Sequence, residues 1–243
     1  MNVDEAINLA NQGNAESMLD LGSYYYDQGE YHNARDWYCK AAENGLLQAM
    51  VPAALLTGMV VRATRKISGG DAIHDEDVNK LGIALAWIER ARAAGIECDA
   101  SALIRERGLC AYEAAKKEGS NVSQESSIRF LKEAYATPNT APEVEIFLAC
   151  ALYEAEQLTA EDTVLCFDLL KSCVNFTEED GVDVNLGVLE FYLGSCYLKG
   201  KGTPVDVNAA HDCFVRAGQK GFDCSDILRN FKKKLFGGYV LQR

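Results

Sequence analysis

The sequence predicts an all-α protein built from stacked helix pairs, and three observations support this class. One pattern of small and aromatic residues occurs twice, near both ends of the chain. Only 4 prolines are spread over 243 residues, and stretches rich in Ala, Leu, Glu and Lys recur, which favours helix throughout. A helix pair of this kind cannot bury its apolar face alone, so several pairs must stack into an extended repeat structure.

The clearest copy of the pattern lies within residues 21–45. It reads Leu21-Gly22-x-x-Tyr25, then Gly29-x-Tyr31, then Ala34-x-x-x-Tyr38-x-Lys40-Ala41. The small residues let two helices approach closely, and the aromatic rings fill the space between the helices. A second copy predicts the same helix–turn–helix unit near the C-terminus: Leu193-Gly194-x-x-Tyr197 followed by Ala210-x-x-x-Phe214-x-x-Ala217.

Five segments share the spacing of the second helix of this unit, which predicts about five helix pairs. Each has a larger residue three or four positions after its first residue and a further packing residue at seven. The segments begin at Ala34, Ala84, Ser127, Thr163 and Ala210. Gly45, Gly95 and Gly221 close three of them, where a helix needs a left-handed residue at its C-terminus.

The ends of the chain predict caps for the stack. Residues 1–14 read as a second helix without a first, which would form an N-terminal capping helix. Residues 15–221 would hold the repeats, with a loop insertion near 62–80 that contains Ser68-Gly69-Gly70-Asp71. A capping helix at about 223–236 and a tail would complete residues 222–243. On this basis residues 1–243 form a single solenoid domain.

The charge and the N-terminus restrict the partners. The net charge of −12 disfavours nucleic acid, because phosphate contacts need a basic surface, and it favours a basic or apolar partner. The N-terminus has neither a basic region nor an apolar core of a secretory signal. No apolar run is expected to reach membrane-spanning length. We therefore expect a cytoplasmic protein that does not bind membranes.

The nine cysteines predict packing rather than disulfide bonds. None falls in a CxxC pair. Five of them lie within expected helices at positions that face a neighbouring helix: Cys39, Cys150, Cys166, Cys196 and Cys213. A reduced cysteine behaves as a small buried hydrophobic residue, which explains this placement.

These residues resemble two related repeat families. The first copy fits the tetratricopeptide repeat (TPR), with Gly29-Glu30-Tyr31 as its tight turn. The turn of the last copy, Gly200-Lys201-Gly202-Thr203-Pro204-Val205-Asp206, is similar to the Sel1-like repeat. The resemblance implies an α/α right-handed superhelical solenoid of TPR/Sel1-like pairs. It also implies a non-catalytic scaffold or adaptor that binds other proteins.

In these families the first helix of each pair lines the concave face, and this implies a binding surface. In the first pair the stripe facing the groove comprises Glu16, Leu19, Ser23, Tyr26 and Asp27. The same offset in the fourth pair presents Ile146, Cys150, Tyr153 and Glu154. In the last pair it presents Phe191, Ser195, Leu198 and Lys199. Apolar and acidic residues together suit a protein or peptide segment with apolar and basic side chains. The alternative is that Leu19, Ile146 and Phe191 pack the seam between neighbouring pairs.

Signals for chemistry are weak. His32, His74 and His211 lack partners at metal-ligand spacing, and the Ser68-Gly69-Gly70 segment lacks the ending of a phosphate loop. No nucleophile elbow or Cys–His pairing is recognisable, so we expect no enzyme activity, no cofactor and no metal. The alternative function is a self-assembling structural repeat protein. In it the tail, an apolar run from Leu235 to Leu241, enters the groove of another copy and builds a homo-oligomer instead of docking on its own last repeat.

Overall fold

A computed structural model describes residues 2–177, 184–234 and 237–242, and 69% of it is helical. The sequence predicts one domain over residues 1–243, whereas the chain divides into two compact units, Met1–Pro138 and Asn139–Arg243. Packing in a helical repeat is mainly between neighbours in the sequence, and each unit is described by itself below.

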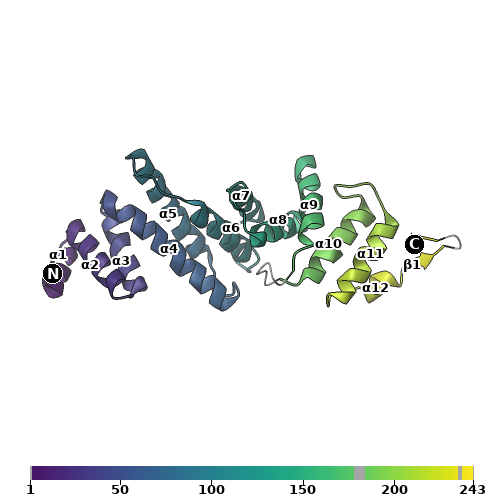
Figure 1. Ribbon diagram of the computed structural model, residues 1–243, viewed down its shortest axis with the longest axis horizontal. Coiled ribbons are helices and arrows are strands. Elements are labelled where there is room, and N and C mark those ends of the chain that lie inside the picture. Colours follow the sequence, from purple (N-terminus) through teal and green to yellow (C-terminus); the bar gives the residue numbers. More distant parts are fainter. Residues whose placement is uncertain (1, 178–183, 235–236, 243) are drawn as a thin grey trace. The chain divides into compact units, whose positions relative to one another are not determined.

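The first unit is a capping helix followed by three helix pairs (Figure 1). Its helices are α1 (Val3–Asn11), α2 (Ala15–Asp27), α3 (Tyr31–Glu43), α4 (Leu47–Ser68), α5 (Asp75–Ala93), α6 (Ser101–Ala115) and α7 (Gln124–Tyr135). Helix α2 packs on α3, α4 on α5, and α6 on α7, while α1 packs on α2 as the expected N-terminal cap.

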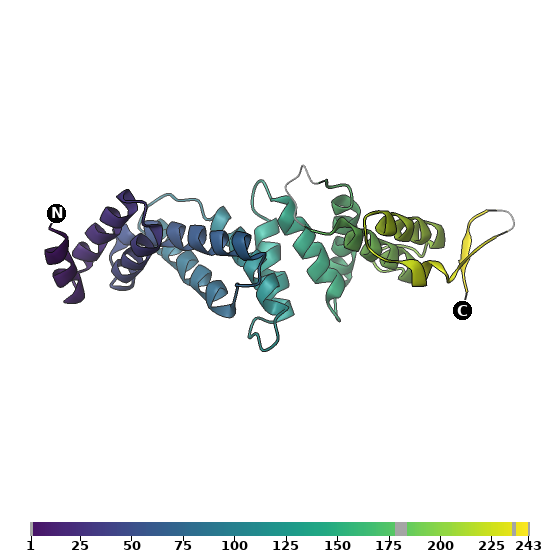
Figure 2. The same cartoon turned by 90° about the horizontal axis from the view of Figure 1, so that it is seen from below.

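The second unit holds two more pairs and a short C-terminal hairpin (Figure 2). Its elements are α8 (Pro142–Glu154), α9 (Ala160–Cys173), α10 (Leu186–Lys199), α11 (Val207–Gln219), α12 (Ser225–Leu228), β1 (Phe231–Lys233) and β2 (Tyr239–Leu241). Helix α8 packs on α9 and α10 on α11. The all-α repeat fold and its five pairs are therefore as the sequence predicts.

All five expected second helices are present, as α3, α5, α7, α9 and α11. The small residues that define the spacing in α3 and α11 are fully buried. The three closing glycines, Gly45, Gly95 and Gly221, have φ angles of 87°, 86° and 85°. Each therefore adopts the left-handed conformation that ends a helix, as predicted.

Glycine in the first helix of the two clear copies allows the aromatic ring of the second helix to reach the backbone. A Cβ on Gly194 would lie 3.0 Å from a ring carbon of Phe214, and Gly22 faces the ring of Tyr38 even more closely. The Leu-Gly motif thus sets the spacing between the two helices of a pair.

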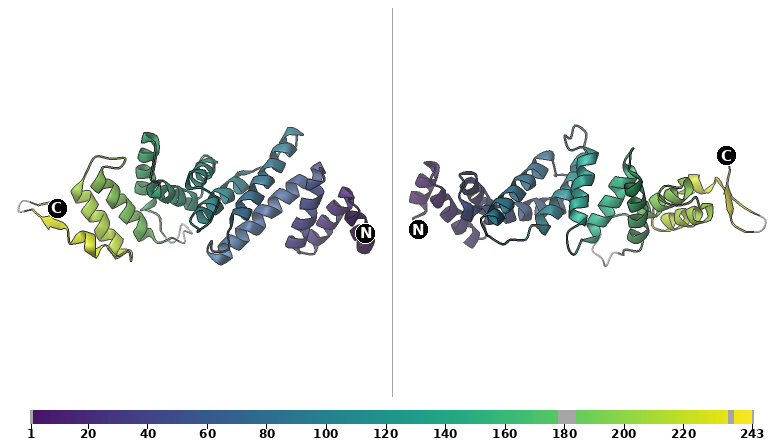
Figure 3. Two further views of the ribbon diagram at one scale, coloured as in Figure 1. Left: turned by 180° about the vertical axis from the view of Figure 1, so that it is seen from behind. Right: turned by 90° about the horizontal axis from the view of Figure 1, so that it is seen from above.

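The insertion expected near 62–80 is helix rather than loop. Helix α4 continues to Ser68 and α5 begins at Asp75, so the connection is only residues 69–74 (Figure 3). Gly69, with φ of 60°, ends α4 in the left-handed conformation. Four of the residues 62–68 are Ala, Arg or Lys, which are good helix formers, and the helix ends at the Gly69-Gly70 pair rather than at the first charged residue.

The length of α4 also corrects the expectation about apolar runs. Among the described residues, α4 is the one helix long and apolar enough to cross a membrane, judged by length and composition alone. Its 22 residues pack against α3, α5 and α6. The inner helix of a helical-repeat core has the same length and composition, so the segment by itself is weak support for a membrane span.

The prediction of a C-terminal capping helix is also wrong. Helix α12 has a single turn, and the chain then forms an antiparallel hairpin in which Lys232 pairs with Val240. Gly237 and Gly238 have φ angles of 90° and 77°, and consecutive glycines favour a hairpin over a helix. The lysine run therefore lies along a strand, not at a helix end. The apolar residues 235 and 236 of the expected tail lie outside the described residues.

The cysteines pack as predicted. All nine are free thiols, and seven of them are buried, including Cys150, Cys166, Cys196 and Cys213. Cys39 is half-buried in α3. Burial raises the pKa of the thiols of Cys39, Cys110 and Cys173, because burial disfavours the charged thiolate.

Candidate interaction surface

The first helix pair and α4 form a hollow of about 410 Å³ in the first unit. The turn between α2 and α3 and the first residues of α3 line one side, and the middle of α4 lines the other. The lining residues are Gly29, Glu30, Tyr31, His32, Asn33, Met59, Val60 and Ala63. The hollow exists because α4 has 22 residues and α3 has 13, so α4 extends past the N-terminus of α3.

Large apolar side chains are exposed at this hollow. Tyr31 is 45% exposed and Met59 is 54% exposed. Tyr26, at 48%, lies edge-on to Tyr31 with ring centroids 5.5 Å apart. Aromatic residues and methionine are enriched at protein interfaces, and a group of three exposed side chains is more informative than an isolated one.

The α2–α3 side of the hollow is acidic, whereas the α4 side carries the exposed residue Arg62 next to Ala63. Residues 2–46 hold eight Asp or Glu side chains and only two basic ones, Arg35 and Lys40. Glu30 lines the hollow, and Asp27 is exposed at the last residue of α2. An acidic side chain at a helix C-terminus opposes the helix dipole, so Asp27 does not stabilise its own helix.

The residues predicted in the first pair divide between core and surface. Leu19 is half-buried against the core cluster of the unit, and this fits the alternative of seam packing. Ser23 is exposed, and its hydroxyl oxygen accepts a hydrogen bond of 3.1 Å from the Tyr38 hydroxyl. Tyr26 and Asp27 are exposed beside the hollow. Glu16, at the start of the predicted stripe, is also exposed, so the stripe is accessible except at Leu19.

In the second unit three predicted contact residues are buried. Ile146 is fully buried, and Cys150 and Ser195 are each 6% exposed. Helices α8 and α10 each pack against the other and against α9, and α10 also packs on α11. Neighbouring helices cover α8 and α10 on more than one side. The residues that the helical spacing predicts to face the groove therefore lie in the core. The expectation that these three residues contact a partner is wrong.

Tyr153 belongs to a small aromatic cluster rather than to an open groove. Its ring stacks on Tyr192 at 4.0 Å between centroids, and the Lys201 ammonium lies 4.9 Å from the same ring. The Tyr192 hydroxyl donates to Glu154 Oε1 at 2.9 Å. Burial, followed by this hydrogen bond, raises the pKa of Tyr192. The cluster joins α8 to α10 and to the turn that follows α10.

The remaining α10 residues that were predicted to contact a partner also divide between packed and exposed positions. Leu198 and Phe191 are half-buried against the cluster around Phe214, so Phe191 packs the seam as the alternative states. Lys199 is exposed at the last residue of α10. The predicted residues of the second unit therefore do not come together as one accessible surface.

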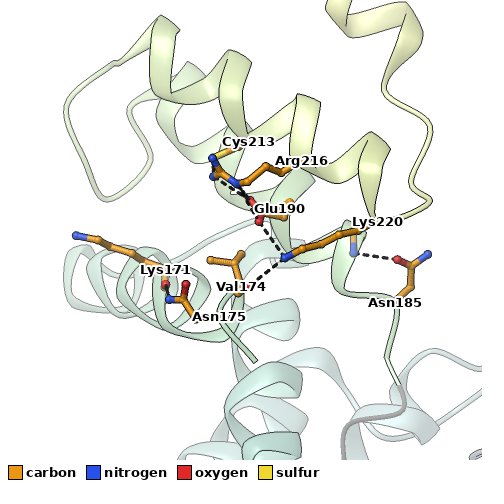
Figure 4. A network of polar contacts seen from close by, with 9 residues as sticks. Lys171, Val174, Asn175, Asn185, Glu190, Cys213, Arg216 and Lys220 are labelled. Atoms are coloured by element: carbon orange, nitrogen blue, oxygen red, sulfur yellow. Dashed lines mark hydrogen bonds and ion pairs between the residues drawn. The ribbon is translucent and has the colours of Figure 1, made fainter. Parts of the chain in front are cut away.

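A buried carboxylate network holds the last pair together (Figure 4). Glu190 of α10 is 2% exposed and accepts hydrogen bonds at 3.0–3.1 Å from Arg216 Nε of α11 and from Nζ of Lys220, the residue that follows α11. Lys220 Nζ also donates to the carbonyl of Val174 at 3.0 Å, which ties the end of α9 to the pair. The role of this network is positional, because its carboxylate is fully engaged.

The described residues contain no cluster suited to metal chemistry. His32 lines the hollow, His74 precedes α5, and His211 stacks on Tyr239 with ring centroids 3.6 Å apart. The carboxylate of Asp75, which follows His74, accepts bonds from the Ser120 hydroxyl and the Asn121 N–H. These bonds lower the pKa of Asp75.

Comparison with protein-family models gives two matches to the Sel1 repeat, at residues 15–46 and 189–222. These two segments are similar to Sel1 repeats, and they are called the first and the second Sel1 repeat below. The first Sel1 repeat comprises α2 and α3, and the second comprises most of α10 together with α11. Sel1 repeat proteins are generally non-catalytic scaffolds for protein–protein interaction.

Two crystal structures are similar to this chain. One is a protective antigen of uropathogenic Escherichia coli strains with an SLR fold, at 17% identity and a TM-score of 0.27 over 95% of this chain and 50% of that one. The other is a Sel1 repeat protein from Oxalobacter formigenes, at 16% identity and 0.22, over 90% and 76%. The chain thus spans about half the length of the first. At these TM-scores the likeness carries no argument about a site. Comparison with curated proteins gives no match.

The surface residues Tyr31, Met59, Val60 and Ala63 are absent from the stripe that the sequence predicts. The repeat pattern assigns Tyr31 only to the tight turn, and the α4 residues lie at or beside the segment expected to be an insertion. The absence of proline and of a Gly-Gly pair between Ala53 and Gly69 is the signal that α4 extends beyond its partner α3.

Proposed function

We propose that this chain is a non-catalytic, cytoplasmic scaffold that binds an apolar and basic protein segment at its first Sel1 repeat. The hollow between α3 and α4 is the binding site, with Tyr26, Tyr31 and Met59 as apolar contacts. The observation that carries the proposal is the grouping of these three exposed side chains around a hollow of about 410 Å³. Binding sites commonly have volumes of about 300–1,000 Å³.

The charge of the surface supports the basic character of the segment. Glu30 lines the hollow and Asp27 is exposed two residues before Gly29, which also lines it, so lysine or arginine side chains of the segment would reach them. Rim charges of this kind contribute mainly to the association rate and to specificity. The aromatic and methionine side chains would supply most of the affinity.

A peptide library displayed on phage tests the proposal, because it samples many candidate segments at once. Peptides selected on the wild-type protein should be enriched in Lys, Arg and apolar residues. Tyr31→Ala and Met59→Ala should each weaken binding of a selected peptide by about tenfold, the loss of about 1.4 kcal/mol typical of an interface contact. Fluorescence anisotropy with the labelled peptide measures the change.

Ile83→Ala is the matched control, because Ile83 is also an apolar helix residue of the first unit, is 53% exposed, and lies outside this hollow. This control should bind like wild type. Thermal unfolding of all three variants should stay close to wild type, since the side chains are exposed. Selected peptides that bind Tyr31→Ala and wild type equally would show that the site lies elsewhere.

A further inference from the structure

The C-terminal hairpin of β1 and β2 has one face packed against α11. Its other face, called the open face below, is exposed to solvent. Tyr239 stacks on His211 of α11, its N–H donates to Asn208 Oδ1 at 2.7 Å, and Phe231 packs on Phe214. Lys232 and Val240 are paired across the two strands and are both exposed. Directly paired residues lie on the same face of a sheet, so the open face presents a basic and an apolar side chain together.

The hairpin differs in charge from the rest of the chain. Residues 229–242 hold four basic side chains and no acidic one, although the net charge of the chain is −12. Lys232, Lys233 and Lys234 are exposed, as are Val240 at 39% and Leu241 at 43%. The hairpin extends away from the helices of its own unit (Figure 2). Its exposed side chains are therefore accessible to a partner.

The first Sel1 repeat is the complement of the hairpin. The hollow beside this repeat offers the exposed side chains of Tyr31 and Met59 where the open face of the hairpin offers Val240, and the repeat offers carboxylates where the hairpin offers lysines. Asp27, which opposes the dipole of its own helix, gains a favourable partner in such a contact. Both surfaces belong to the same chain, one in each compact unit.

We propose that the hairpin of one copy docks in the hollow at the first Sel1 repeat of a second copy. This inference rests on the proposed function, since it names the occupant of the same site. The contact joins two different surfaces, so one copy keeps a free hollow and the other keeps a free hairpin. Repetition of the contact then gives a ring or an open chain of copies.

A second copy fits better than another polyanion. Nucleic acid would bring a high density of phosphate close to a chain that carries an excess of 12 negative charges, and this disfavours binding beyond the hairpin. The same repulsion applies to an anionic lipid surface. The acidic first repeat, in contrast, provides both the charge and the apolar contact that the open face of the hairpin needs.

Sedimentation equilibrium on the full chain tests the inference with two exposed double variants. The weight-average mass of the wild type should rise with protein concentration at low salt and fall when salt is added, because salt screens exposed charges. Lys232→Glu/Lys233→Glu should abolish the rise, and so should Asp27→Lys/Glu30→Lys. A mixture of the two variants, each monomeric alone, should associate again, because both contacts between unlike variants join opposite charges: the altered hairpin with the altered hollow, and the unaltered hairpin with the unaltered hollow.

Lys171→Glu/Lys199→Glu changes the net charge by the same amount as the hairpin variant, on exposed residues of α9 and α10, and should associate like wild type. A wild type that stays monomeric at every concentration at low salt overturns the inference. A wild type that stays monomeric but binds phosphatidylserine vesicles through Lys232 and Lys233 overturns it in favour of a lipid partner. If library peptides still bind the hollow in either case, the proposed function stands and only its occupant is wrong.

Discussion

A methyl group on Gly22 would lie 2.5 Å from Cδ1 of Tyr38, so the first Sel1 repeat closes around a contact that only glycine allows. Gly22→Ala should therefore destabilise the protein by about 1–3 kcal/mol, the usual effect of overpacking a core. The ring of Tyr38 is 7% exposed and has no free space to move into. Urea unfolding followed by circular dichroism measures the effect.

Gly82→Ala is the control for this prediction. Gly82 also lies within a helix of the first unit, α5, but a Cβ there meets nothing within 4 Å. Alanine is the better helix former by about 1 kcal/mol, so this variant should be as stable as wild type or more stable. Equal destabilisation by both variants would show that the Gly22–Tyr38 approach does not limit the packing.

The second prediction concerns the buried carboxylate of Glu190. Glu190→Gln removes the charge that Arg216 and Lys220 contact, yet these cations are 46% and 32% exposed and regain water. We therefore expect a loss of about 1–3 kcal/mol, below the 3–5 kcal/mol of a fully buried pair. The exposed pair of Asp226 and Arg229 is the comparison, and Asp226→Asn should change stability by less than about 0.5 kcal/mol.

The third prediction is that few thiols react in the folded protein. Only Cys39 and Cys98 are partly accessible among the nine free cysteines. Intact mass after N-ethylmaleimide treatment should show at most two adducts under native conditions and nine in guanidinium chloride. More than two adducts before unfolding would mean that the helix pairs open locally and often.

The fourth prediction is a loss of stability at alkaline pH. Burial raises the pKa of the Cys213 thiol from its ordinary value of 9.0 to about 11. The folded thiol therefore keeps its proton at a pH where the unfolded thiol has lost it. The resulting stability is fully present below about pH 9 and is lost as pH rises toward 11, with a slope of up to about 1.4 kcal/mol per pH unit.

Urea midpoints measured between pH 8 and 11 check this slope. Cys213→Ala is the control, because it removes the titrating thiol, and its stability should fall less steeply with pH than that of wild type. Parallel slopes for the two proteins would assign the alkaline loss to other groups, such as the buried thiol of Cys173, whose pKa burial raises to about 12.

The helix pairs are predictable because their spacing depends on local chemistry. Small residues at Ala34 and Ala41 and a glycine at position 45 specify one face and one end of a helix, and neither depends on the rest of the fold. The surface is harder to predict. Ile146 and Cys150 lie on α8, which is buried on several sides, so its sequence has no polar stripe to show which face is free.

Two further features, the hollow and the contacts of Glu190, cannot be predicted from the sequence. Each depends on how separate helices lie beside one another. The hollow arises from the difference in length between α3 and α4, and the spacing within either helix does not show it. Glu190 is one acidic residue among many until Arg216 and Lys220 are brought beside it. The hairpin is within reach of sequence reasoning, since Gly237-Gly238 is a turn signal, but a lysine run also suits the end of a helix, and the two signals compete.

Packing between neighbours in the sequence has a mechanical consequence. Most of the elements that pack together follow one another directly along the chain, so pulling the two ends apart would load the interfaces between helix pairs in series. We expect force to remove the pairs one after another, each releasing its own length of chain. In a globular protein of the same size, strands from distant segments pair at the centre. Force would instead unfold such a protein in one cooperative step.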